Sequence, residues 1–182
     1  MKTVNNYTIN PNTAVIMPDY DKDANLYSKV IDGNEPLIVK MSPYKIIEHS
    51  MLYYCSTLQG ATIAARTVLG NIKMSPVVLC TQLDIYLFPS SSPRKNECIW
   101  FSHEHVKDTV QISTNKTNVH LTNRHTITME INKLRFDKKH DRATKLRHIL
   151  TERIKTPATY EEDDMSGLQI CMDPSKNRYD IN

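Results

Sequence analysis

The spacing of apolar residues changes near residue 132, and this change limits the folds open to the chain. Over residues 109–131 apolar and polar residues alternate, with apolar side chains at Val110, Ile112, Val119, Leu121, Ile127, Met129 and Ile131. Polar turns at Asn115-Lys116 and Asn123-Arg124 divide the stretch. It therefore predicts an antiparallel meander with one buried face.

Residues 134–154 show helical spacing instead. The predicted apolar stripe consists of Ala143, Leu146, Leu150 and Ile154. Pro157 follows and is expected to end the helix, because proline cannot continue it. A long helix directly after antiparallel strands indicates an α+β fold.

The first 55 residues predict short strands followed by a helix. Apolar runs at residues 13–17 and 37–39 read as strands, separated by an acidic stretch and the turn Asp32-Gly33-Asn34. Ser42-Pro43 then predicts the start of a helix over residues 43–55, with serine as N-cap and proline at the first helical position.

Residues 58–69 predict a second helix that ends at Gly70, although their Thr and Val content leaves a strand open. Short apolar runs at 77–80, 85–88 and 98–102 predict further strands, whose aromatic residues Tyr86, Phe88, Trp100 and Phe101 are expected in the core. The predicted fold is α+β, with mostly antiparallel short strands, one or two central helices and a basic C-terminal helix.

Length and composition exclude several classes of protein. The 182 residues fit one domain with a tail, and no apolar run approaches the roughly 18 residues of a membrane span. Residues 1–6 lack the apolar core of a secretory signal, so we expect a cytoplasmic protein. With four glycines there is no glycine-rich nucleotide loop, and the four scattered cysteines read as reduced thiols. We expect no cofactor.

Charge is distributed unevenly along the chain. Residues 133–155 carry nine Lys or Arg against three acidic residues, whereas the last 27 residues carry two against six. This layout is common in proteins that bind polyanions and carry a regulatory or self-shielding extension. We predict a domain over residues 1–156 and a flexible acidic tail over residues 157–182.

The basic side of the C-terminal helix is the strongest candidate binding surface. Helical geometry places Lys138, Arg142, Lys145 and Arg153 in one arc, with Arg135 and Lys139 in or next to it. Such an array neutralises several phosphates at once. The alternative is a solvated helix face whose charge is offset by Asp137, Asp141 and Glu152.

The loop over residues 90–96 is a second candidate. Its Arg94 and Lys95 are suited to an A·T-rich minor groove, where the negative potential is enhanced. The alternative is an ordinary polar connection. Arg124 and Lys116, each in a turn, are weaker candidates for the same kind of minor-groove contact.

His103 and His105 offer a metal-binding alternative, because they would point to the same face of a strand. No spacing identifies a third ligand, and hydrogen-bonded histidines at a strand end are the simpler interpretation. No nucleophile motif is present, so we predict that the protein is not an enzyme.

Two segments resemble a known family. Ile46-Ile47-Glu48-His49-Ser50, followed by Tyr53-Tyr54, resembles the I-[IV]-[ED]-R-S-C-x-F-[FY] stretch of the competence transcription factors called ComK. Ile85-Tyr86-Leu87-Phe88-Pro89, then Ser92, Cys98-Ile99-Trp100 and residues 102–106 are similar to the family's I-F-L-F-P-T…C-G-W-I-S-H-x-H-V block. The resemblance extends over about residues 5–155.

The resemblance implies an activator of genes for DNA uptake. Family members bind paired A·T-rich boxes through the minor groove as dimers that form tetramers, and an adaptor recognises their C-terminal region for a Clp protease. The residues expected to contact DNA are Arg66, Lys73, Arg94, Lys95, Arg124, Lys138, Lys139, Arg142 and Lys145.

The sequence departs from the family at two basic positions, which are held here by His49 and Ala61. These departures favour an alternative function. The chain would be a divergent paralogue that does not bind DNA alone and regulates a related activator by heterodimerisation or adaptor titration.

Overall fold

The computed structural model describes residues 1–156, which contain a seven-stranded sheet in the order β1-β4-β3-β2-β7-β6-β5. The strands are β1 (Lys2–Val4), β2 (Thr13–Tyr20), β3 (Leu26–Asp32), β4 (Glu35–Val39), β5 (Val77–Cys80), β6 (Ile85–Pro89) and β7 (Trp100–Ser102). Neighbouring strands are antiparallel apart from β1 and β4, which are parallel. The predicted α+β class and its antiparallel character are confirmed.

A second sheet contains β8 (Val106–Ser113), β9 (Lys116–Leu121) and β10 (Thr126–Met129). It is the predicted antiparallel meander. The expected burial of Val110 and Ile112 is wrong, because these residues are 47% and 55% exposed. The register of β8 shifts before Asp108 and pairs Thr109 with Val119, so Thr109 takes the inward face and Val110 the outward one.

α1 (Pro43–Tyr53) and α2 (Leu58–Leu69) begin where the sequence predicts. The Ser42 hydroxyl accepts a hydrogen bond from the N–H of Lys45 at 3.3 Å, and Pro43 is the first helical residue. α2 ends at Gly70, whose φ of +89° favours glycine. The alternative of a strand over residues 58–69 is wrong.

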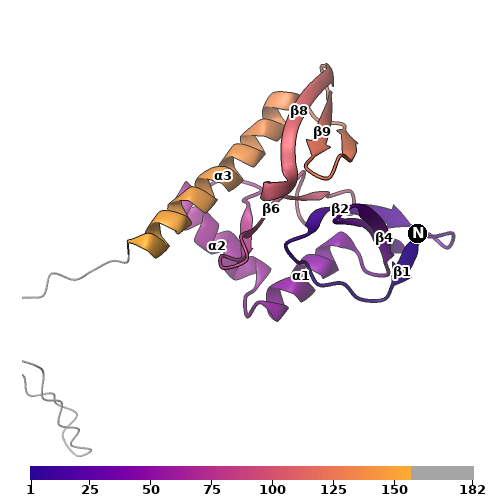
Figure 1. Cartoon of the computed structure of the whole chain (residues 1–182), viewed down its shortest axis with the longest axis horizontal. Coiled ribbons are helices and arrows are strands. Elements are labelled where there is room, and N and C mark those ends of the chain that lie inside the picture. Colours follow the sequence, from indigo (N-terminus) through magenta and orange to yellow (C-terminus); the bar gives the residue numbers. More distant parts are fainter. Residues whose placement is uncertain (157–182) are drawn as a thin grey trace, which may run out of the picture.

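α3 (Lys133–Lys155) follows Asn132, whose side chain accepts a hydrogen bond from the N–H of Leu134 at 2.9 Å. Ile154, expected in the buried stripe, is 63% exposed. The helix is about 35 Å long and runs past the strands that cover its first half (Figure 1). Pro157, expected to end the helix, and the predicted acidic tail lie outside the described residues.

The larger sheet is covered on both faces. Ile16 and Trp100 belong to the hydrophobic cluster that includes Ile47 of α1. Val15 and Phe101, next to them along the same strands, belong to the cluster that includes α3 and the smaller sheet. Figure 1 shows α1 and α3 on either side of these strands.

β6 lies between the two clusters. Leu87 packs in the cluster of α1 and Phe88 in the cluster of α3, and all five residues of the strand are buried. Trp100, Tyr86 and Phe101 are also buried, which confirms the prediction that these aromatic residues form core. Among the helices of residues 1–156, none combines the length and the apolar composition that a membrane span requires.

Candidate nucleic-acid interface

α3 has a basic flank that faces α2 and the loop between α2 and β5. Burial of Phe136, Ala143 and Leu146 fixes the rotation of the helix. That rotation places a row of cations beside the buried stripe. The row consists of Arg135, Lys138, Arg142, Lys145 and Arg153. Arg142 is half-buried and the other four are exposed, so the predicted arc is present on the folded helix.

The loop from α2 to β5 is held from both sides by arginines. Arg66 of α2 donates from Nε to the carbonyl oxygen of Ile72 at 3.2 Å. Arg142 of α3 donates from Nη1 to the carbonyl oxygen of Lys73 at 3.5 Å. Lys73 itself, whose carbonyl oxygen Arg142 contacts, is exposed. Three of the predicted DNA-contacting residues are thus gathered at one loop, although they are distant in sequence.

Lys139 lies beneath this surface and is only 8% exposed. Its ammonium group contacts the sulfur atom of Met74 at 3.3 Å. Burial lowers the pKa of Lys139, and the neighbouring charge of Arg142 lowers it further. Unlike the flanking cations, Lys139 is therefore buried in the contact between α3 and the α2–β5 loop.

The loop between β6 and β7 brings two more cations to the same region. Its ends are closed by Ser90 and Ile99, whose backbone groups are joined by a hydrogen bond of 2.8 Å. Arg94 of this loop and Arg66 of α2 line one hollow on the surface. Lys95, which is exposed, pairs with Glu97 at 3.3 Å.

Apart from Lys95, the cations of this surface are not neutralised within the described residues. Over residues 1–156, no carboxylate lies within ion-pair distance of Arg66, Lys73, Arg94, Lys138, Arg142 or Lys145. Asp137 instead pairs with Lys133 and accepts a hydrogen bond from Thr109 at 2.7 Å. Glu152 pairs with Lys155. These contacts argue against the alternative of a charge-offset helix face, because two of its three acids are used elsewhere.

Arg124 is placed apart from the other candidates. It lies in the turn between β9 and β10, at a φ of +70°. The neighbouring Asn123 donates from its side chain to the carbonyl oxygen of Gly33 at 2.5 Å, which attaches this turn to the β3–β4 hairpin. Lys116, the weaker candidate, pairs with Glu130 at 2.9 Å.

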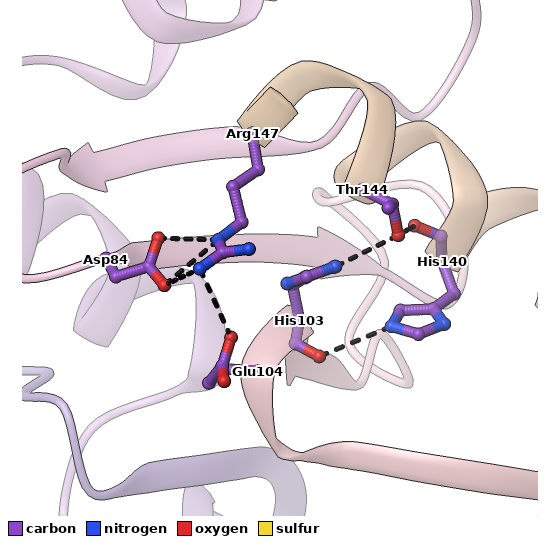
Figure 2. Close-up of polar contacts among 6 residues, drawn as sticks. All are labelled: Asp84, His103, Glu104, His140, Thr144 and Arg147. Atoms are coloured by element: carbon purple, nitrogen blue, oxygen red, sulfur yellow. Dashed lines mark hydrogen bonds and ion pairs between the residues drawn. The ribbon is translucent and has the colours of Figure 1, made fainter. Parts of the chain in front are cut away.

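The opposite flank of α3 is fixed by internal bonds. Figure 2 shows Arg147 donating to both carboxylate oxygens of Asp84, with Nε 2.7 and 2.9 Å from them. Glu104 lies 3.8 Å from the same guanidinium group. This bidentate pair lowers the pKa of Asp84. Arg147 is therefore committed to holding α3 against the β5–β6 turn.

His103 and His105 lie in a 3-10 turn, η1 (His103–His105), so the expectation that they share one face of a strand is wrong. His105 uses both ring nitrogens, bonding Thr122 at 3.0 Å and the carbonyl oxygen of Pro11 at 2.8 Å. His103 bonds Thr144 at 2.9 Å (Figure 2). Hydrogen-bonded histidines at a strand end are confirmed. Over residues 1–156, no three His, Cys, Asp or Glu side chains gather as metal ligands.

The two positions where the sequence departs from the resembled family differ in setting. His49 is exposed on α1. Ala61 faces an apolar groove between α2 and α3, and it packs against the core cluster of α1. Neither position lies on the α2–β5 loop that gathers Arg66, Lys73 and Arg142.

Sequence reasoning missed two features of this region. The buried stripe of α3 begins at Phe136, which stands seven residues before Ala143 and was detectable from that spacing. The bond between Arg147 and Asp84 joins residues 63 apart, and no local pattern signals it.

The fold and the basic surface together define an α+β protein whose cations converge from α2, α3 and two loops. Comparison with known families places it more narrowly. The family model described as ComK protein matches residues 4–155, so the chain belongs to the ComK family. This membership confirms the resemblance noted in the sequence.

The competence transcription factor of Bacillus subtilis strain 168 is a relative, 27% identical over 148 residues. The match covers 81% of this chain and 77% of the relative. No solved structure matches the chain.

Proposed function

We propose that this protein is a transcription factor of the competence system that binds A·T-rich DNA. Membership of the ComK family and the name of the Bacillus subtilis relative support the regulatory role. The observation that carries the DNA-binding part is the group of cations on α2, α3 and the α2–β5 and β6–β7 loops. Six of them have no acidic partner within residues 1–156, namely Arg66, Lys73, Arg94, Lys138, Arg142 and Lys145, whereas Lys95 pairs with Glu97. An exposed group of this kind is suited to a phosphate backbone.

The contacts divide into two kinds. Arg66, Lys73 and the exposed residues of the α3 flank would contact phosphates. Arg94 and Lys95, at the end of a closed loop, would enter a narrow A·T-rich minor groove. Lys139, which is buried, would not contact DNA directly. It would pack α3 against the α2–β5 loop and add positive electrostatic potential to the surface above it.

Arg124 contributes only if the DNA extends to the β9–β10 turn or if a second copy of the chain presents it. Paired DNA boxes call for a symmetric dimer or a tetramer. Such a regulator would act in the cytoplasm with the chromosome. The C-terminal residues would be where a Clp protease adaptor recognises it.

A second candidate function is a regulator that does not bind DNA alone and pairs with a related activator or titrates its adaptor. One observation favours it: the family's basic positions are held by His49 and by Ala61, and Ala61 faces an apolar groove. The two candidates differ in whether the purified chain binds DNA.

The test is a titration of fluorescent duplexes with the full-length protein at two salt concentrations. One duplex carries two A·T-rich boxes, and the other is a G·C-rich control of equal length. We expect tighter, salt-sensitive binding to the A·T-rich duplex. Equal affinity for the two would refute minor-groove selection, and no binding by folded protein would favour the second candidate.

A further inference from the structure

An apolar groove runs between α2 and α3 next to the basic flank. Its volume is about 470 Å³, and its lining includes Ala61, Ala64, Val68, Val78, Leu146 and Leu150. Three of the six α2 residues that line the groove are alanine, and one of these, Ala65, is the one residue of α2 that is buried. Small side chains on α2 leave the hollow because they do not reach α3. The groove is therefore an apolar surface without a covering element among residues 1–156.

The chain leaves the described structure at one end of this groove. Arg153 of α3 belongs to its lining, and Thr156 follows three residues later. The next residues carry two blocks of sequence. Residues 161–164 are Glu-Glu-Asp-Asp, and residues 165–172 are Met-Ser-Gly-Leu-Gln-Ile-Cys-Met. An acidic block followed directly by an apolar block matches a basic flank that lies beside an apolar groove.

The length of chain allows this match. Lys145 stands eleven residues before Thr156, which is about 16 Å along a helix. An extended chain covers up to about 3.3 Å per residue, so residues 161–164 reach roughly 16 to 26 Å from Thr156. This range brings the acidic block alongside Lys145 and Arg142 when the chain turns back.

We propose that residues 161–172 fold back over α3, with residues 165–172 seated in the α2–α3 groove and the acidic block against the basic flank. Burial of Leu168 and Ile170 would contribute the apolar part of the interaction. Four carboxylates beside cations that have no acidic partner within residues 1–156 would contribute the electrostatic part. The docked segment then covers cations that DNA phosphates would use, which makes it an internal competitor. The docking does not depend on the proposed function, whereas the competition rests on it.

The docking is tested without DNA by hydrogen exchange of the full-length protein. Leu168→Asp/Ile170→Asp should release the segment, and an intramolecular equilibrium constant of about 10 would make α2 amides exchange about tenfold faster. Ile181→Asp, a similar change outside the docked segment, is the matched control and should leave exchange unchanged. Equal exchange of α2 in wild type and double variant would overturn the proposal.

A change in the groove provides the reciprocal test. Ala64→Glu fills the groove and places a like charge near the acidic block, so amides of residues 165–172 should exchange faster. Gln59→Glu, on the same helix but lining the other hollow with Arg66, is the control. If protection of α2 instead varies with protein concentration, a second copy covers the groove and the proposal is wrong.

The competition is tested by neutralising the acidic block in the full chain with Glu161→Gln, Glu162→Gln, Asp163→Asn and Asp164→Asn. Affinity for A·T-rich DNA should rise about tenfold at low salt, because the competent fraction increases. Unchanged affinity, with docking shown by exchange, would overturn the competition. Absence of DNA binding in both proteins would refute the proposed function and leave the docking result intact.

Discussion

Removal of two charges from the α3 flank should change how salt affects DNA binding. In Arg142→Ala/Lys145→Ala, two cations without acidic partners in residues 1–156 are lost, and Lys145 is exposed. Each phosphate contact contributes about 0.9 to the slope of log affinity against log salt, so the slope should fall by about 1.8. Between 50 and 200 mM salt, the wild-type protein should then lose about 12-fold more affinity than the variant.

The structural cost of this change is small. The bond from Arg142 to the carbonyl oxygen of Lys73 is long at 3.5 Å, and its loss should cost no more than about 0.5 kcal/mol of unfolding free energy. Urea unfolding checks that figure. Arg142→Lys retains the charge but not the guanidinium geometry, so it should retain most of the slope.

The assay is fluorescence anisotropy with one A·T-rich duplex over at least four salt concentrations. Lys2→Ala/Lys22→Ala removes two exposed charges from the other half of the protein and is the matched control. A slope in the α3 variant equal to that of the control would refute α3 as a phosphate-binding surface, whatever happens to the absolute affinity.

Four further outcomes follow from the contacts described. Phe136→Ala should lower the free energy of unfolding by about 3–5 kcal/mol in urea titrations. The reason is that the Phe136 ring is fully buried and packs edge-on against Phe101, with 5.1 Å between the two ring centroids. Lys139→Met should leave stability unchanged or raise it by about 1 kcal/mol in the same assay, since a buried ammonium is replaced by an apolar chain of similar length. Burial lowers the pKa of His103, and the charge of His140 lowers it further. Thermal stability should therefore fall as the pH drops through and below 6.5, and His103→Gln should weaken this pH dependence. A second loss of stability should follow as the pH falls below 3.8, because the bond to Arg147 lowers the pKa of Asp84 in the folded protein, and Asp84→Asn should make this loss smaller.

The helices were predictable because their signals are local. Ser42-Pro43 and Gly70 specify helix ends through their own backbone preferences, and no distant contact needs to be known. The three-stranded meander was equally apparent from alternation. The face of β8 was not, because an irregularity before Asp108 reverses which residues point inward.

The composition of the basic surface was only partly predictable. Helical spacing placed Lys138, Arg142 and Lys145 together, but the burial of Lys139 depends on Met74, which is 65 residues away. The association of Arg66, Lys73 and Arg142 likewise depends on how two helices pack around one loop. Sequence patterns specify which side of an element is apolar, and tertiary contacts decide which charged residues remain exposed beside it.

The order of strands in the larger sheet determines when the cations can assemble during synthesis. β2 pairs with β7, and this pairing brings together Val15 and Phe101, which are distant in the sequence. The middle of the sheet therefore cannot form until residue 102 has been synthesised. α3, which supplies Phe136 to one face of that sheet, comes last. A nascent chain that lacks α3 therefore has one face of the larger sheet incompletely covered, and it lacks the row of cations on α3. Folding and acquisition of the basic surface are completed in the same late step.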